Sequence, residues 1–256
     1  MWAVHTAFLE LIEDNQSPGG DVPVVLPAGY SGNGSCHDIA WTAAYPQIAR
    51  FLYDRYGLDR PMKRQWKSLV LYMENLITHA EASPQTLAVC DQFKDWLCGT
   101  AQSCCTVGEK GTTECPVGPE MGGFNYVLAL RAMAAMGHAQ ALTTQATRYA
   151  KLADAATASF HTLFWNSSTQ SYGGDTGAVQ SLTTPAIMIG SPPAELAPHV
   201  LATLEEDLSL RTGFNPEVGA VTSKILLNVL SENGLHHTAL RTATTDTEPS
   251  WGFWFR

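Results

Sequence analysis

The sequence predicts an all-α protein built from helical hairpins, arranged as part of an α/α toroid. Three observations support this prediction. Apolar residues recur at helical spacing through most of the 256 residues, glycines follow several of these stripes, and one pattern of helix, glycine and helix occurs twice. No alternating strand pattern of comparable length accompanies them. We therefore expect a single domain over residues 1–256 that forms a partial barrel of hairpins.

Apolar stripes define the expected helices in chain order. The segment 191–208 adds a further helix, because Pro192 or Pro193 is tolerated in a first turn. The residues of the other stripes are Trp41, Tyr45, Ile48, Leu52 and Tyr56; Trp66, Leu69, Val70, Met73, Leu76 and Ile77; Tyr126, Leu130 and Met133; Tyr149, Leu152, Ala153, Ala156, Phe160, Leu163 and Phe164; and Val218, Val221, Ile225 and Val229.

Glycines indicate where the helices end. Gly57, Gly137 and Gly234 each follow a stripe, at the position where a left-handed glycine usually closes a helix, and a second helix is expected within a few residues. The sequence at 123–142, which runs from GFN to HAQAL, is echoed at 213–240 by GFN and HHTAL. The repeating unit is therefore a pair of helices.

Glycine-rich polar segments precede the first helix of each expected pair. They read GNGSCHD, MGGFN, YGGD and TGFNPE. If these first helices form the inner ring of a toroid, their N-terminal ends surround a concave pocket. A helical bundle with ordinary loops has the same periodicity, so the pattern alone leaves both architectures open.

Composition limits the classes of partner. The net charge is −9 and only 15% of residues are charged, so the chain has no basic footprint for nucleic acid or an anionic membrane. No apolar run approaches the length of a membrane span, and the acidic start lacks the features of a signal peptide. We expect a neutral or weakly polar ligand.

The cysteines indicate an oxidising compartment. Five of the six lie in a polar, glycine-rich loop at about 90–121, and we expect disulfides to staple it. Zinc is the alternative, but the loop has no C-x-x-C pair and no histidine, so we expect no metal site there. Three glycosylation sequons agree with secretion. The cysteines are Cys36, Cys90, Cys98, Cys104, Cys105 and Cys115, and the sequons begin at Asn15, Asn33 and Asn166.

Acidic and aromatic residues occur together in the expected pocket. Asp38 and Trp41 begin one helix, Asp95 and Trp96 lie in the cysteine-rich loop, and Tyr126 begins another helix. This combination suits a sugar, because carboxylates bind hydroxyls and an indole stacks on the C–H face of a pyranose. The other interpretation is that the aromatic side chains are part of the core.

A succession of motifs resembles the catalytic domain of α-L-rhamnosidases, of the six-hairpin glycosidase type. The resemblance implies an α/α toroid that hydrolyses terminal α-L-rhamnosides with inversion and uses no cofactor. It also implies substrate-binding roles. Asp38 and Asp95 are expected to accept hydrogen bonds from sugar hydroxyls, Trp41 and Trp96 to form walls of the sugar pocket, and Trp251 to lie near that pocket. The motifs are GDVPVVLP, HDIAWTAAYPQIARFLYDRYG, FKDWL, NYVLALRAMAAMGH, FHTLFWNSSTQSYGG, TGFNPEVGAVTSKILLNVLSENG and EPSWGFWF.

The sequence departs from the family pattern in three places. Nothing in residues 1–20 matches the acidic motif that carries the general acid, and the chain ends after PSWG, before the motif that carries the general base. Ala43 also replaces a carboxylate that the family commonly has. The catalytic residues are therefore unknown, and we expect this chain alone to be inactive.

Three hypotheses remain open at this point. The chain is a fragment of an α-L-rhamnosidase, or a complete sugar-binding protein that lost both catalytic carboxyls, or a different toroid glycosidase. The third hypothesis requires acids of this chain to catalyse the reaction, against the simpler interpretation that they are solvated or cap helices. These acids are Asp91, Glu120, Asp175 and Glu217.

Overall fold

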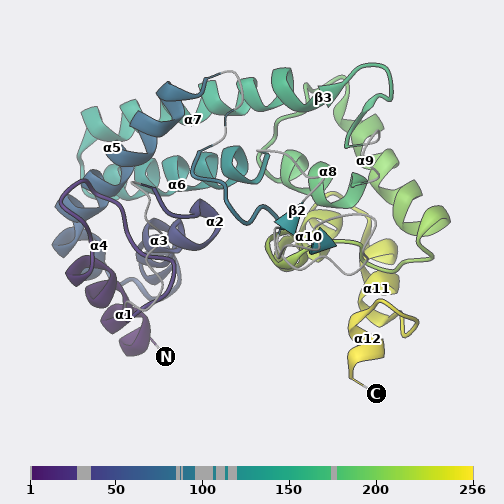
Figure 1. Ribbon diagram of the computed structural model, residues 1–256, viewed down its shortest axis with the longest axis horizontal. Helices are drawn as coiled ribbons and strands as arrows, with labels where there is room; N and C mark the ends of the chain where they lie inside the picture. The colour runs from purple at the N-terminus through teal and green to yellow at the C-terminus, as the bar shows by residue number, and fades with distance from the viewer. Residues whose placement is uncertain are drawn as a thin grey trace. The chain divides into compact units, whose positions relative to one another are not determined.

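The computed structural model describes residues 2–27, 36–84, 87, 89–95, 106–107, 113–114, 120–173 and 178–255. These residues are mostly helical, which confirms the all-α prediction (Figure 1). No helix among them has the length and apolar character needed to cross a membrane. The chain divides into two compact units, Met1–Gln92 with Gly122–Thr157 and Phe93–Met121 with Ala158–Arg256.

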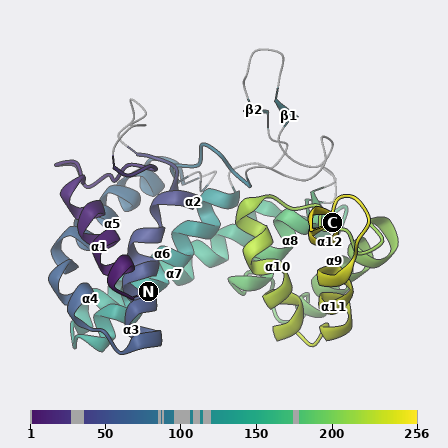
Figure 2. The ribbon, with the colours of Figure 1, turned by 90° about the horizontal axis from the view of Figure 1, so that it is seen from below.

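The first unit contains the N-terminal helices. Helix α1 packs against α3, as both views show (Figures 1 and 2), and α4 packs against α3 and α5. Leu9, Leu52 and Leu69 are fully buried in its core. Its helices are α1 (Trp2–Asp14), α2 (Ile39–Thr42), α3 (Ala44–Tyr56), α4 (Arg60–Arg64), α5 (Trp66–Ala82), α6 (Glu120–Ala139) and the first part of α7 (Thr143–Phe164).

The first stripe forms two helices instead of one. Asp38 caps α2, a turn at Ala43 interrupts the helix, and α3 continues to Tyr56. Gly57 closes α3 with φ of 65°, and its N–H donates to Tyr53 at 2.9 Å. Since glycine adopts this left-handed conformation without a steric penalty, the predicted end of the helix is confirmed here.

Gly137 has a different role from the one predicted. It lies inside α6, which continues to Ala139, and its position allows α6 to approach α7 closely. A Cβ atom at Gly137 would meet the Cβ of Ala146 at 3.0 Å. The prediction that this glycine ends its helix is wrong, because here the missing side chain serves helix packing.

The second unit contains the C-terminal helices and two small antiparallel hairpins. Helix α10 packs against both α8 and α11. Leu204, Leu226 and Leu230 form the centre of a buried apolar cluster between α9 and α10. The elements are β1 (Thr106–Val107), β2 (Thr113–Glu114), β3 (Trp165–Asn166), β4 (Ser171–Tyr172), α8 (Val179–Met188), α9 (Ala197–Glu206), the π-helical turn η1 (Asp207–Arg211), α10 (Ala220–Glu232), α11 (His236–Thr244) and α12 (Trp251–Trp254).

Helix α9 begins later than expected. Residues 194–196 form a turn, and Pro198 instead of Pro192 or Pro193 occupies the first turn of the helix. A proline disfavours the helical conformation of the residue before it, so the Pro192–Pro193 pair cannot begin a regular helix at 191. Gly234 has φ of 85° directly after α10, and the predicted end of that helix is confirmed.

The two GFN segments differ in structure. The first, at 123–125, lies inside α6, whereas the second, at 213–215, lies in the loop before α10. We expected the MGGFN segment to be a loop that leads into a helix. This prediction is wrong, because the segment lies inside α6. Only the second segment supplies irregular backbone next to a helix N-terminus.

Candidate functional site

Five of the six predicted substrate-binding residues lie in the described structure, and they form two groups. Asp38, Trp41 and Tyr126 belong to the first unit, and Asp95 and Trp251 belong to the second. Trp96 lies outside the described residues.

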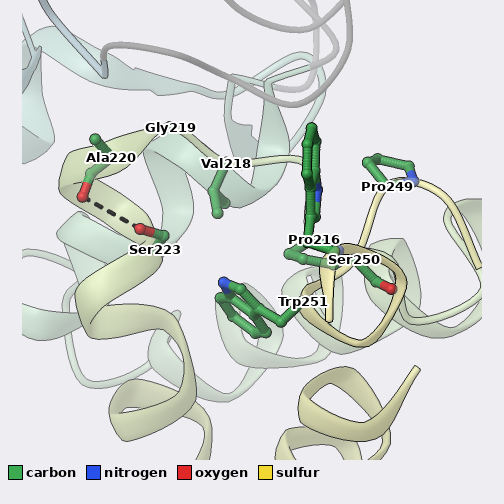
Figure 3. A pocket seen from close by; sticks show the side chains of 9 residues that line it. Pro216, Val218, Gly219, Ala220, Ser223, Pro249, Ser250 and Trp251 are labelled. Atoms are coloured by element: carbon green, nitrogen blue, oxygen red, sulfur yellow. Dashed lines mark hydrogen bonds between the residues drawn. The ribbon is translucent and has the colours of Figure 1, made fainter. Parts of the chain in front are cut away.

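A pocket of about 270 Å³ lies in the second unit at the N-terminus of α10. Figure 3 shows the indole of Trp251 pointing toward Val218 and Ser223. The Ser223 hydroxyl donates to the carbonyl oxygen of Ala220 at 3.2 Å. The pocket has apolar walls and a few polar atoms, which is the usual composition of a small-molecule site. Its lining consists of Pro216, Val218, Gly219, Ala220, Ser223, Pro249, Ser250, Trp251 and Trp254.

Asp95 fixes the backbone at the mouth of this pocket. Its fully buried carboxylate accepts hydrogen bonds from the N–H groups of Gly219 at 2.9 Å, Val221 at 3.1 Å and Thr222 at 3.0 Å. These groups belong to the start of α10, where free N–H groups and the helix dipole favour a negative charge. Asp95 therefore acts as a helix cap from a segment more than 120 residues earlier in the chain.

Ser250 fixes the opposite wall. This buried residue is the N-cap of α12, and its hydroxyl accepts a hydrogen bond from the N–H of Phe253 at 3.1 Å. The cap places Trp251 in the first turn of α12, half-buried against the pocket. Trp254 also lines the pocket, although 76% of its surface is exposed.

A network of charged residues directly precedes α10 in the sequence and belongs to the same unit as the pocket. Arg211 binds Glu217 at 2.6 Å and contacts the buried Asp207 through two nitrogens, at 2.6 and 2.9 Å. Gln180 donates to Asp207 at 3.0 Å and accepts from the N–H of Glu217 at 2.8 Å. Hydrogen bonding to Asp207 raises the pKa of Arg211 well above its usual value. Glu217, one of the four acids of the third hypothesis, is therefore a member of an ion pair.

Asp38 in the first unit also has a structural role. It is fully buried, and its carboxylate accepts from the N–H groups of Ala40 at 2.9 Å and Gln92 at 2.7 Å. Trp41 lies three residues further on in α2 and is half-buried. Asp38 therefore joins the start of α2 to the segment after α5.

Tyr126 lies in α6 and is 4% exposed. Burial raises the pKa of its hydroxyl well above the usual value, and the nearby charges of Glu81 and Glu74 raise it further while Arg148 opposes them. These charged residues belong to α5 and α7. The phenol is therefore neutral at physiological pH and can act as a hydrogen-bond donor.

A buried acid and a buried histidine of the first unit were not predicted from the sequence. Asp21 accepts from the backbone N–H of His37 at 2.9 Å and also pairs with the Nδ1 atom of the same ring. The Nε2 atom of His37 is buried and has no hydrogen-bond partner within the described structure. The only sequence signal for this pair is that Cys36 lies among polar residues, in the segment GNGSCHD. Cys36 itself forms a disulfide with Cys90.

The described residues include one group whose atoms could bind a metal. It consists of Cys36, Cys90 and His79, with potential ligand atoms within 4.8 Å of one another. The four remaining cysteines of the predicted staple, Cys98, Cys104, Cys105 and Cys115, lie outside the described residues.

Comparison with protein families places this geometry in a known context. Residues 1–256 match the family described as the bacterial alpha-L-rhamnosidase 6 hairpin glycosidase domain. None of the curated proteins matches the chain in sequence.

Solved structures of similar fold include three α-L-rhamnosidases. The enzyme from Dictyoglumus thermophilum has a TM-score of 0.81 and 22% identity, with 100% of this chain and 27% of that chain covered. The Streptomyces avermitilis enzyme, solved with L-rhamnose, has a TM-score of 0.74 and 19% identity, covering 98% and 22% of the two chains. The Aspergillus terreus enzyme has a TM-score of 0.75 and 14% identity, with 98% of this chain and 28% of that chain covered. The chain thus spans about a quarter of the length of these relatives.

Proposed function

The chain belongs to the family of bacterial α-L-rhamnosidase six-hairpin glycosidase domains, and we propose that it contributes the sugar-binding part of an enzyme that releases terminal α-L-rhamnose from rhamnosides. The observation that carries this proposal is the family match, which extends over all 256 residues. The solved relative with bound L-rhamnose supports the same substrate class. Because the chain spans about a quarter of the length of its relatives, the activity is proposed for the whole protein.

The pocket beside Trp251 has chemistry that suits rhamnose. The sugar is a 6-deoxy hexose, so it presents a methyl group and an apolar C–H face together with its hydroxyls. Trp251 and Val218 offer apolar surfaces to these groups, and the hydroxyl of Ser223 lies on the same wall. An indole face stacks well on the C–H face of a pyranose, and the adjacent polar atoms can fix its orientation.

The two buried acids constrain how a sugar can be held. Asp95 receives three backbone hydrogen bonds and Asp38 receives two, and neither carboxylate is exposed. We propose that Asp95 shapes the pocket through the backbone of Gly219, while Trp251 contacts the sugar directly. Direct hydroxyl binding by Asp38, Asp95 or Tyr126, and sugar stacking on Trp41 and Trp96, stay predictions.

The proposed chemistry is inverting hydrolysis. One protonated carboxyl assists the leaving group, and one carboxylate activates water on the opposite face of the ring, about 6.5–9.5 Å away. We place neither of these groups among the 256 residues. The residues of this chain bind and orient the sugar, which contributes to rate through positioning.

Proton NMR during hydrolysis of p-nitrophenyl α-L-rhamnopyranoside tests this function on the complete product of the gene. Inversion predicts that β-L-rhamnose appears first and that the α anomer follows only by mutarotation. First appearance of the α anomer would contradict inversion while leaving the substrate class intact. An absence of hydrolysis by the folded complete product would contradict the activity itself.

The proposed secretion of the protein rests on the disulfide and on the sequons. The Cys36–Cys90 disulfide is typical of proteins from oxidising compartments. Detection of the native protein in culture medium or in the secretory pathway would support this localisation, and detection only in the cytosol would contradict it.

A further inference from the structure

Three metal-binding side chains meet at one place in the first unit. Cys36 precedes α2, His79 lies in the last turn of α5, and Cys90 follows α5. Their potential ligand atoms all lie within 4.8 Å of one another. The cysteine-rich loop contains no histidine, but the fold brings His79 of α5 to two of the cysteines.

Hydrogen bonds hold the two cysteine segments together independently of the disulfide. The N–H of Ile39 donates to the carbonyl oxygen of Cys90 at 2.9 Å. The side-chain amide of Gln92 donates to the backbone carbonyl oxygen of Cys36 at 3.1 Å. The N–H of Gln92 also donates to Asp38 at 2.7 Å. Since none of these bonds involves sulfur, they keep the two segments adjacent after the disulfide is reduced.

We propose that Cys36, His79 and Cys90 form a binding site for a thiophilic divalent cation of the zinc class when their disulfide is reduced. Two thiolates and one imidazole are ligands that zinc prefers, at about 2.3 Å for sulfur and about 2.0–2.1 Å for nitrogen. A tetrahedral site with these bond lengths separates the two sulfur atoms by about 3.8 Å. The observed clustering within 4.8 Å is compatible with this geometry.

The surroundings of the site allow a cation to enter. Cys36 is buried, whereas His79 and Cys90 are partly exposed, so the cluster is in contact with solvent. Three protein ligands leave the fourth position of the cation to a water molecule, as in zinc sites that remain open.

The proposed exchange between disulfide and metal requires reduction of the disulfide first. A dithiol reductant supplies two electrons and two protons to the Cys36–Cys90 bond and becomes a disulfide itself. The cation then displaces one proton from each thiol and binds the neutral imidazole of His79. A disulfide oxidant restores the Cys36–Cys90 bond: it accepts the two electrons of the thiolates, takes up two protons to become a dithiol, and the cation is released. The site therefore holds either a disulfide or a metal ion.

Cobalt titration of the reduced chain tests this proposal. Co²⁺ replaces Zn²⁺ as a spectroscopic probe, and thiolate ligands give a strong near-ultraviolet charge-transfer absorption. Replacement of Cys98, Cys104, Cys105 and Cys115 by serine restricts this signal to the proposed site. We expect one equivalent of Co²⁺ to bind after reduction, Zn²⁺ to displace it, and the oxidised protein to give no such absorption.

Matched histidine variants identify the third ligand. His79→Ala is expected to weaken Co²⁺ binding by at least about tenfold, whereas His138→Ala, an exposed histidine of the same unit, is expected to leave it unchanged. Circular dichroism verifies that each protein is folded, and if the four-serine protein is not, the two histidine variants are compared in the otherwise unchanged chain.

Two results would overturn the proposal. The first is a folded, reduced protein without thiolate-to-cobalt absorption. The second is equal Co²⁺ affinity in the His79→Ala and His138→Ala variants.

Discussion

Gly219 donates its backbone N–H to the carboxylate of Asp95 over 2.9 Å, and a Cβ atom at Gly219 would clash with the backbone carbonyl of Asp95. The contact joins two segments that are 124 residues apart in sequence. It also places the first turn of α10 at the pocket that contains Trp251. The shape of this pocket therefore depends on a glycine and a buried acid.

Replacement of Gly219 by alanine should destabilise the protein. The added methyl group forces the backbone of Asp95 or of α10 to move, and overpacking of this kind costs about 1–3 kcal/mol. Denaturant unfolding measures the change in the free energy of unfolding. Gly19→Ala is the control, because a Cβ atom there would meet only the Ser17 hydroxyl, at 3.8 Å. Equal stability of the two variants would contradict the proposed close packing.

Arg211 should contribute more to stability than an exposed arginine. Arg211→Met leaves the buried Asp207 without its main cation, and we expect a loss of about 2 kcal/mol because Arg211 itself is partly exposed. Arg148→Met removes an exposed pair with Glu74 and a cation–π contact with Tyr149, and it should cost less than about 1 kcal/mol. The same unfolding measurement compares the two variants, and a larger loss for Arg148→Met would disprove the ranking.

Stability should fall steeply in alkaline solution. Burial raises the pKa of Tyr149 and Tyr172 to about 12, and it raises the pKa of Tyr45, Tyr72 and Tyr126 further. A tyrosine whose pKa is higher in the folded state stabilises the fold fully below pH 10, and this contribution is lost as pH rises above 10.

Parallel absorbance and circular dichroism titrations measure this effect. We expect the buried tyrosines to ionise together with the loss of helix. Ionisation of all eight tyrosines before any change in ellipticity would show that these phenols are accessible in the folded protein.

The Cys36–Cys90 disulfide should stabilise the fold substantially. It joins residues 54 apart, and the chain-entropy estimate for a loop of this length is about 4 kcal/mol. We expect the Cys36→Ser, Cys90→Ser double variant to lose up to this amount in urea unfolding, without added metal. A double variant as stable as the unchanged chain would show that the hydrogen bonds around Gln92 suffice.

The helices were predictable from the sequence because their apolar stripes satisfy local rules. Leu52 and Leu69 are buried where the helical spacing places them, and Gly57 ends its helix as predicted. Gly137 resembles Gly57 in sequence, but it packs against α7 inside a continuous helix. A glycine indicates that backbone freedom or space is needed, and only the tertiary structure shows which of the two applies.

The site was predictable in part. The sequence singled out Trp251 and Asp95, and Trp251 does line a pocket. The sequence could not show that Asp95 caps α10, because a cap from a distant segment leaves no local pattern. The Asp21–His37 pair and the position of His79 beside the cysteines were missed for the same reason.

Calorimetric titration of the 256-residue chain with L-rhamnose measures whether the Trp251 pocket binds this sugar. We expect saturable binding that is lost in a Trp251→Ala variant and retained in a Trp2→Ala variant, whose altered side chain is exposed on α1. Circular dichroism shows whether both variants keep their helices. An absence of binding by the folded chain, or equal binding by the two variants, would contradict the assignment of the Trp251 pocket to rhamnose.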